Sequence, residues 1–323
     1  IDMIRAGIPA QYNNTQVVTY HKFRHMHGTW DLVLVDEVQD LPEYIIRELF
    51  SKGRRVIVAG DVNQSIYDNV CPTESISAIL GGKSFSLRII HRISRRIRQV
   101  AQFFCSDRDG FNSATMGRLV ELLPRLIKAT SYEEECRWII SSAKEYGHSG
   151  YVPAVLIPNH RLIFTFIQTL LQLENKPLMP QAYFGNARAN YLRINAHLRS
   201  NGLKFQYLGN GAGSFEEASQ ESLVTIMTYH SAKGLDFRAV FIPFLTPDLD
   251  IWSDPISRAR TLFFVSVTRS REQLFLSYHG NSKHPFLQEI PDDHFHNLSA
   301  SEEIIRMNNP NGNPDEKETI VVF

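Results

Sequence analysis

Two acidic residues, Asp36 and Glu37, directly follow a short apolar run at 32–35. Carboxylates that follow a strand face the ligand crevice of an open α/β sheet. Such a pair suits a nucleoside triphosphate, because one acid can hold Mg²⁺ through water while its neighbour acts as general base toward the attacking water. We expect Asp36 to hold the metal and Glu37 to be the base. A strand that ends in a polar turn is the alternative.

A second polar segment follows the apolar run at 56–59 and contains Asp61, Gln64 and Tyr67. Gln64 is placed to hydrogen-bond a γ-phosphate or the attacking water. Tyr67 is suited to stacking on an unpaired base. A β-turn followed by a core tyrosine is the alternative for this segment.

The spacing of apolar residues places both segments in a strand–helix–strand pattern, which predicts a parallel sheet covered by helices. In the first part of the chain, buried strands are predicted at 16–20, 32–35 and 55–59, with a crossover helix at 42–51. The later chain repeats the pattern. Its predicted elements are a strand at 85–90 and a helix through 104, a strand at 152–157 and a helix at 161–173, and strands at 223–227, 239–243 and 273–278.

These patterns predict two α/β domains, at 1–84 and 85–291. The chain opens on Ile1 without a start signal for a domain, so the first domain is expected to be incomplete. Residues 175–203 are rich in Pro, Asn and Gly and are expected to form a small insertion in the second domain. Residues 292–323 are polar and predict a loose C-terminal tail.

The charge balance excludes a strongly basic protein, since 34 Lys and Arg residues match 34 Asp and Glu residues. Any nucleic-acid surface must therefore be a local patch. The cysteines Cys71, Cys105 and Cys136 are far apart and odd in number, which argues against a disulfide framework or a zinc site and favours a reducing, cytoplasmic setting. The apolar runs are strand-sized, so no membrane span is expected.

The two polar segments resemble a known pair of motifs. The strings V-D-E-V-Q-D at 35–40 and G-D-V-N-Q-S-I-Y at 60–67 are similar to motifs II and III of UvrD/Rep-like superfamily 1 DNA helicases. Other similar strings stand in the family's order, and together they cover residues 17–291. They are T-Y-H-K-F at 19–23, H-R-I-S at 91–94, T-Y-H-S-A-K-G-L-D-F at 228–237, V-S-V-T-R-S-R at 265–271 and P-F-L-Q-E-I-P at 285–291.

The resemblance implies two RecA-like domains of the P-loop NTPase type, each a parallel sheet flanked by helices, with the first domain incomplete. It implies ATP and Mg²⁺ in the cleft between the domains. The implied partner is single-stranded DNA, or DNA with single-stranded tails. The implied activity is that of an ATP-dependent DNA helicase or translocase that moves in the three-prime to five-prime direction.

The resemblance also assigns nucleotide contacts in the second domain. Arg92 and Arg269 would neutralise charge that develops on the γ-phosphate, a task that suits an always-charged planar guanidinium better than a lysine. Gly234 and Asp236 are implied to contact the nucleotide. Asp236, which is shorter than the family's usual Glu, would accept a hydrogen bond from a ribose hydroxyl. Surface salt bridges are the alternative for the two arginines.

The DNA contacts implied by the resemblance come from both domains. They are Thr19, His21, Phe23, Tyr67, Thr228, His230 and Ser231. Hydroxyl and imidazole donors in this set would position the DNA backbone without reading its sequence. A buried core residue is the alternative for His230.

One motif of the family is missing from the chain. No G-x-x-x-x-G-K-[ST] occurs, and the nearest string, G-G-K-S at 81–84, follows motif III. The family's phosphate-binding loop lies upstream of the segment at 19–23, so truncation is the simplest explanation and genuine loss is the rival. Without this loop, we expect the chain alone to bind ATP weakly and hydrolyse little. A degenerate DNA-binding or scaffold module is therefore the alternative function.

The accessory domains of the family also look reduced. Residues 23–31 are too few to hold one, and 175–203 could hold only a remnant of another. Translocation along single strands is therefore expected more firmly than autonomous unwinding. A helicase–nuclease subunit is a further rival, but no nuclease-like cluster of acids and lysine is recognised after residue 291, and a longer native C-terminus would reopen this alternative.

Overall fold

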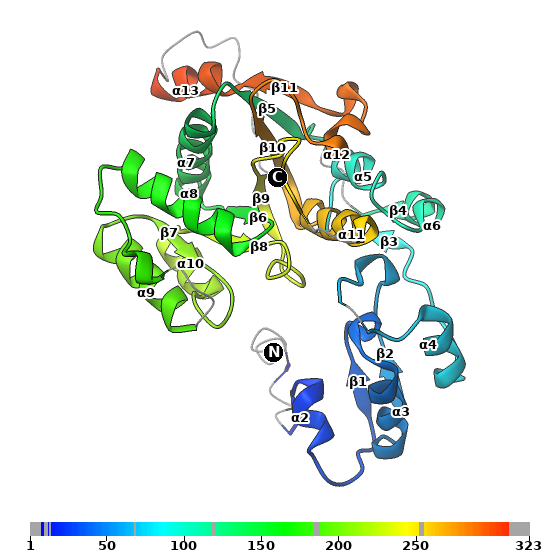
Figure 1. Ribbon diagram of the computed structural model, residues 1–323. Helices are drawn as coiled ribbons and strands as arrows, with labels where there is room; N and C mark the ends of the chain where they lie inside the picture. The colour runs from blue at the N-terminus through cyan, green and yellow to red at the C-terminus, as the bar shows by residue number, and fades with distance from the viewer. Residues whose placement is uncertain are drawn as a thin grey trace. The chain divides into compact units, whose positions relative to one another are not determined.

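The computed structural model describes residues 8–9, 12, 14–67, 69–117, 121–183, 188–251 and 255–309 (Figure 1). The chain divides into two compact units, 1–87 and 88–323. The sequence predicted a boundary between residues 84 and 85. Each unit is described below by itself.

The first unit contains a two-stranded parallel sheet joined by a crossover helix. Strand β1 (Val33–Val35) pairs in register with β2 (Val56–Val58), and α3 (Glu43–Lys52) connects them. The strands and the helix were predicted at these places. The remaining elements of the unit are α2 (Tyr20–Arg24), η2 (Val38–Asp40), η3 (Val62–Gln64) and α4 (Thr73–Leu80).

The apolar pattern of α3 explains the core of this unit. Its residues Ile45, Ile46 and Leu49 recur at helical spacing and are buried. Ile45 and Ile46 belong to a small core that packs against Val35 and Val58, on one face of the sheet. On the other face, Leu34 is 66% exposed and Ile57 is 59% exposed. The prediction that these strands are buried is therefore correct for one face only, since successive side chains point to opposite faces.

The predicted strand at 16–20 is wrong. Residues Tyr20–Arg24 instead form α2, and Thr19 is its N-cap. The Thr19 hydroxyl accepts a hydrogen bond from the Lys22 backbone N–H at 3.2 Å. An N-cap threonine satisfies a donor of the first helical turn, which favours a helix start over continued extension.

The second unit is built around a seven-stranded, all-parallel sheet with strand order β11-β5-β10-β9-β6-β8-β7. Its strands are β5 (Arg125–Ala129), β6 (Ala154–Ile157), β7 (Phe205–Tyr207), β8 (Val224–Thr228), β9 (Phe237–Ile242), β10 (Ser270–His279) and β11 (His296–Ser299). Every residue of β6 and β8 is buried, as expected for a parallel sheet covered on both faces. The mixed α/β fold with a parallel sheet flanked by helices is thus confirmed for this unit.

Helices cover both faces of this sheet. Figure 1 shows α7 (Tyr132–His148) and α8 (His160–Leu173) on one face and α11 (Ile256–Val267) on the other. The other helices are α5 (Arg95–Ala101), α6 (Arg108–Ser113), η4 (Gln181–Tyr183), α9 (Arg188–Ser200), α10 (Phe215–Glu221), α12 (Pro285–Gln288), η5 (Asp292–His294) and α13 (Ala300–Asn308). A separate two-stranded sheet pairs β3 (Ile89–Ile90) with β4 (Thr115–Met116), so the strand predicted at 85–90 is shorter than expected.

The segment predicted as an insertion, 175–203, contributes to the core. Helix α9 buries Tyr191, Ile194 and Leu198 completely. These residues stand three and four positions apart, which places them on one helical face. The surrounding polar residues concealed this pattern in the sequence.

The segment predicted as a loose tail contains regular structure, β11 and α13, between residues 296 and 308. Strand β11 pairs in parallel with β5 at the sheet edge, and Ala300 at the start of α13 is fully buried. The strand has no continuous apolar run because it lies at the edge, where His296 and Asn297 are exposed. Residues 310–323 of the predicted tail lie outside the described residues.

No helix among the described residues is both long and apolar enough to cross a membrane.

Candidate nucleotide and nucleic-acid sites

The acidic pair stands where β1 ends. Because Val35 pairs with Val58, the residues that follow β1 and β2 emerge at the same edge of the sheet. Asp36 is exposed, and one of its oxygens accepts a hydrogen bond from the Glu37 backbone N–H at 2.9 Å. Glu37 has φ 54° and ψ 43°, a left-handed conformation that is uncommon outside glycine and recurs at functional sites.

A buried glutamine connects the two strand ends. The Gln39 amide nitrogen donates to the Glu37 carboxylate, and its amide oxygen accepts from the Asp61 backbone N–H at 3.1 Å. A Cβ at Gly60 would lie 2.2 Å from that amide oxygen, so the close approach requires glycine. Sequence reasoning missed Gln39, although it stands within the V-D-E-V-Q-D string.

The predicted phosphate or water contact, Gln64, is held by an acid. Its amide nitrogen donates to Asp61 Oδ2 at 2.9 Å, and Asp61 Oδ1 accepts from the Asn63 backbone N–H at 3.0 Å. Asp61 was not among the predicted site residues. The structure therefore brings Asp36, Glu37 and Gln64 together through Gln39 and Asp61.

Tyr67 lies beside this acid cluster. It is 50% exposed, which excludes the alternative of a core tyrosine. Partial burial of its hydroxyl, then the charges of Asp40 and Glu37, raise the pKa of Tyr67 above its usual value. An exposed ring in this place can accept a stacked base.

The three predicted DNA contacts near the start of the chain differ in exposure. Thr19 and His21 are both exposed; Thr19 also caps α2, and the His21 ring is tilted against the Tyr20 ring at a centroid distance of 3.9 Å. Phe23 is buried, and its ring packs against Trp30 at a centroid distance of 5.4 Å. The structure thus gives Phe23 a packing role, and only His21 presents its ring to solvent.

In the second unit, an aspartate lies between two arginines. Asp236 Oδ2 is 3.3 Å from Arg271 Nε, and Asp236 Oδ1 is 3.9 Å from Arg92 Nε. Arg92 follows β3, Asp236 precedes β9 and Arg271 is in β10, so residues far apart in the sequence meet here. Two positive charges and one negative charge make this cluster attractive to anions.

Arg269, predicted to share the role of Arg92, has different surroundings. It is 1% exposed. Its Nε donates to the Val265 carbonyl at 2.8 Å, and its Nη1 donates to the Leu235 carbonyl at 3.2 Å. These contacts tie the end of α11 to the segment that precedes β9. The structure therefore brings Arg92 and Asp236 together with Arg271, which sequence reasoning did not select.

Gly234 stands in the turn between β8 and β9. Its φ is +79°, and nothing lies within 4 Å of a Cβ built on it. The backbone conformation therefore explains the glycine, because L side chains rarely adopt it.

The turn after β8 holds the remaining predicted DNA contacts. Thr228 is buried, and its hydroxyl donates to Ser231 Oγ at 2.9 Å and accepts from the Ser231 backbone N–H at 3.1 Å. Thr228 thus shapes the turn. His230 and Ser231 are partly exposed, so a fully buried core position for His230 is excluded.

His230 has a neighbour that sequence reasoning missed. Because Ile157 pairs with Thr228, the ends of β6 and β8 meet, and His160 at the start of α8 lies at the same sheet edge. Burial is the main cause that lowers the pKa of both imidazoles, and the charges of Arg258 and His160 lower that of His230 further. Asn210 Nδ2 lies 3.4 Å from His160 Nε2. The pattern of a polar residue after a strand could have identified His160.

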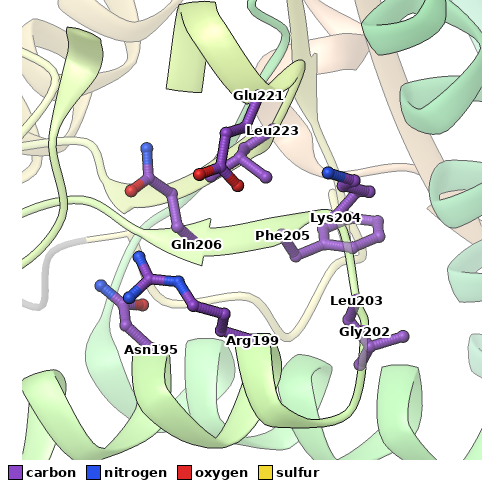
Figure 2. A pocket seen from close by; sticks show the side chains of 9 residues that line it. All are labelled: Asn195, Arg199, Gly202, Leu203, Lys204, Phe205, Gln206, Glu221 and Leu223. Atoms are coloured by element: carbon purple, nitrogen blue, oxygen red, sulfur yellow. The ribbon is translucent and has the colours of Figure 1, made fainter. Parts of the chain in front are cut away.

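A separate pocket lies away from these residues. Figure 2 shows the side chains of Asn195, Arg199 and Lys204 among its lining. Phe205 begins β7 and Leu223 precedes β8, so the pocket borders the opposite ends of the strands from His230. Within the described ranges, no group of three or more His, Cys, Asp or Glu residues could hold a metal ion.

Comparison with protein families finds two matching segments. Residues 12–69 match the UvrD/REP helicase N-terminal domain, and residues 196–281 match the UvrD-like helicase C-terminal domain. Two segments of the chain therefore match the N-terminal and C-terminal domains of UvrD-like helicases, which confirms the predicted resemblance.

Curated relatives agree over partial lengths. The ATP-dependent DNA helicase PcrA of Bacillus subtilis is 31% identical over 104 residues, which cover 27% of this chain and 14% of the relative. The ATP-dependent DNA helicase Rep of Buchnera aphidicola is 41% identical over 64 residues, 18% of this chain and 10% of the relative. The match thus spans about one seventh or less of these relatives.

A solved structure, the C-terminal domain of a possible DNA helicase from Lactobacillus plantarum, has a TM-score of 0.40 and 13% sequence identity. The similarity covers 64% of this chain and 98% of that one.

Proposed function

We propose that this chain is the motor part of a superfamily 1 DNA helicase, and that the complete protein hydrolyses ATP and moves along single-stranded DNA. The observation that carries the proposal is the hydrogen-bonded cluster at the ends of β1 and β2. It holds Glu37 and Gln64 at one sheet edge through Gln39 and Asp61. The relatives, which are named ATP-dependent DNA helicases, support the same activity.

Glu37 is the general base of the proposed reaction. Its carboxylate is half-buried and accepts from the Gln39 amide, which limits the directions in which it points. Gln64, held by Asp61, orients the attacking water. The two side chains act on the same water, one by accepting its proton and the other by hydrogen bonding.

Asp36 fits a water-mediated contact to Mg²⁺. Its side chain is exposed, and the described residues form no closed ligand cluster around it. Mg²⁺ keeps several waters and uses one or two carboxylates together with substrate phosphates, so a single accessible aspartate is sufficient. The ion would neutralise charge on the β- and γ-phosphates of ATP.

Single-stranded DNA, or DNA with a single-stranded tail, is the proposed partner. Tyr67 would stack on a base, and His21, His230 and Ser231 would contact the backbone. All four side chains have solvent access. By family resemblance, movement is three-prime to five-prime, and the phosphate-binding loop belongs to the complete protein. A cytoplasmic location is proposed because its reducing conditions suit Cys71, Cys105 and Cys136, which are thiols in the structure.

The decisive experiment is ATP hydrolysis by the complete gene product, with and without single-stranded oligonucleotide, beside this chain alone. We expect strong stimulation by DNA in the complete protein and little hydrolysis by this chain. Absence of hydrolysis in both, with DNA binding retained, would refute the motor and favour a degenerate binding module.

A further inference from the structure

A glycine-rich turn follows β7, the strand at one edge of the seven-stranded sheet. The string G-N-G-A-G at 209–213, called the glycine turn below, leads from β7 toward α10 and stands outside the strings that carry the family resemblance. Gly209 and Ala212 exchange two backbone hydrogen bonds, with N···O distances of 3.0 Å and 2.8 Å. Between them, Asn210 and Gly211 are exposed, and their N–H groups form no backbone–backbone bond among the described residues. The tip of the turn thus presents two backbone donors to solvent.

The conformation of the glycine turn is fixed at its tip and at its base. Asn210 has φ 49° and Gly211 has φ 75°, left-handed values that asparagine and glycine tolerate best. At the base, the Gln206 amide donates to the Ser214 carbonyl at 2.8 Å and accepts from the Ser214 backbone N–H at 3.2 Å. Because the backbone is held in this way, binding of a ligand would cost little loss of conformational freedom.

Two neighbouring segments contact the glycine turn from the inner side of the sheet edge. Asn210 Nδ2 lies 3.4 Å from Nε2 of His160, the first residue of α8. A Cβ built on Gly209 would lie 2.8 Å from Ser231 Oγ, in the turn that follows β8. The glycine turn therefore adjoins His160 and Ser231, at the C-terminal ends of β6 and β8.

Arg188, the first residue of α9, reaches over the glycine turn. A Cβ built on Gly211 would lie 2.9 Å from Arg188 Nε and 3.1 Å from its Cζ, and Arg188 Nη2 is 3.4 Å from the Gly211 carbonyl oxygen. Arg188 is exposed, and no acid forms an ion pair with it among the described residues. Its guanidinium carries five N–H donors, more than one carbonyl can occupy. A planar guanidinium beside backbone donors suits the oxygens of a phosphate.

The place of the glycine turn in the sheet indicates which phosphate it would bind. The strands β6, β7 and β8 are parallel, so their C-terminal ends share one edge of the sheet. The glycine turn and Ser231 stand at this edge. Asp236, which the resemblance assigns to the nucleotide, precedes β9 and therefore lies at the opposite edge. The glycine turn is thus continuous with the proposed DNA contacts and separate from the proposed nucleotide contact.

We propose that the glycine turn and Arg188 bind a backbone phosphate of single-stranded DNA. The inference rests on the proposed function, whose DNA contact Ser231 lies next to the turn. The N–H groups of Asn210 and Gly211 donate to the phosphate oxygens, and Arg188 neutralises the charge. His160 is a positioning residue that holds the tip through Asn210. Such contacts fix the place of the strand without reading its sequence.

The test measures binding of a labelled single-stranded oligonucleotide to the complete protein, without nucleotide, over a series of salt concentrations. Binding of ATP with Mg²⁺ to the same variants is measured separately. The variants are Arg188→Ala and Arg188→Lys, with Arg199→Ala as control. Arg199 is an exposed arginine near the other end of α9 and pairs with Glu217, so it matches the charge change away from the turn. Thermal unfolding verifies that each variant is folded.

We expect Arg188→Ala to weaken DNA binding by about fivefold at about 0.1 M salt, because loss of one phosphate contact lowers the slope of log K against log salt by about 0.7 for single strands. Arg188→Lys keeps the slope, since it keeps the charge, but recovers only part of the affinity because it lacks the planar fork. Arg199→Ala leaves affinity and slope unchanged, and ATP binding is unchanged in all three variants.

A further variant addresses the turn itself. Asn210→Asp keeps the size of the side chain and places a negative charge beside the bound phosphate, so it weakens DNA binding at least as much as Arg188→Ala does. The control is Asn297→Asp, which makes the same change at an exposed position of β11, on the other edge of the sheet. We expect this control to bind DNA as the unsubstituted protein does.

An unchanged salt slope in Arg188→Ala would overturn the inference, even if affinity or thermal stability fell, because an arginine that only supports the fold releases no counterion. Unchanged DNA affinity in Asn210→Asp would overturn it as well. Loss of ATP affinity in place of DNA affinity would assign the phosphate to the nucleotide and refute the DNA contact. These outcomes leave the proposed function intact, whereas failure of the unsubstituted complete protein to bind the oligonucleotide would overturn both.

Discussion

The two units place polar groups at strand ends in different ways. In the first unit, the cluster around Gln39 spans residues 36–64 and stands on a sheet with one exposed apolar face. In the second unit, the cluster around Asp236 joins residues 92, 236 and 271 and stands on a sheet buried on both faces. Local hydrogen bonds organise the first site, whereas packing between distant segments organises the second.

This difference predicts that substitutions at the first site change the reaction, whereas substitutions around the second site change the stability of the fold. Substitution of Glu37 or Gln64 in the first unit is expected to alter the reaction and leave folding intact, because these side chains are partly exposed. Substitutions in the core of the second unit are expected to alter folding. The predictions below test that separation, beginning with the largest effect.

Glu37→Gln in the complete protein should lower ATP turnover by about 10²–10⁴-fold, the contribution of a general base, while ATP binding is kept. Steady-state hydrolysis and equilibrium nucleotide binding measure the two effects. Glu43→Gln is the control, since Glu43 is a partly exposed acid of α3 that pairs with Arg47. Unchanged turnover in Glu37→Gln would remove the general-base role.

Phe241→Ala should destabilise this chain by about 3–5 kcal/mol, because it creates a cavity in the core. Phe241 is 1% exposed, and its ring stacks on the ring of Phe275 at a centroid distance of 4.5 Å. Leu34→Ala should cost less than about 0.5 kcal/mol, as is usual for surface substitutions. Urea unfolding of this chain measures both. Equal losses would contradict the contrast between the two sheets.

Tyr67→Ala should weaken binding of a single-stranded oligonucleotide by about 1–3 kcal/mol, the contribution of one stacked base. Tyr67→Phe keeps the ring and should retain most of the affinity. Fluorescence anisotropy with a labelled oligonucleotide measures the change. If both variants bind as the unsubstituted protein does, Tyr67 has no stacking role.

The smallest effect concerns the imidazoles of the second unit. Burial lowers the pKa of His160 and His230 in the folded state, so below about pH 6.5, the unfolded value, the unfolded chain binds more protons. Above that pH both imidazoles are neutral in either state and do not reduce the stability of the fold. As the pH falls toward the folded pKa values, protonation favours the unfolded chain and the free energy of unfolding decreases.

His160→Gln should reduce the loss of stability between pH 7.5 and pH 5.5 by a fraction of a kcal/mol. Urea midpoints at the two pH values, compared with the unsubstituted chain, separate this effect from the titration of carboxylates. If the variant loses as much stability between the two pH values as the unsubstituted chain does, His160 has the same pKa in the folded and unfolded states.

Much of the fold was predictable because apolar periodicity is a local signal. The strands that became β1, β2, β6, β8, β9 and β10 were each predicted within a few residues. Helix α9 and strand β11 were missed, since polar residues dominate their outward faces. The segment at 16–20 was mistaken for a strand because its β-branched residues outweighed the capping signal of Thr19.

The candidate site was predictable where its chemistry is local. Asp36, Glu37 and Gln64 stand in short strings directly after strands, so the sequence by itself determined which groups lie at that sheet edge. The supporting residues Gln39 and Asp61 were missed, because their roles depend on hydrogen bonds between the two strand ends.

Only the tertiary structure decided which arginine of the V-S-V-T-R-S-R string reaches solvent. The resemblance selected Arg269, but Arg269 and Arg271 stand two residues apart and no local pattern predicts which of them is buried. The packing of α11 against the segment before β9 buries Arg269 on backbone carbonyls. The bulge in β10 turns Arg271 toward Asp236. Both effects arise from contacts between distant segments, which no local pattern records.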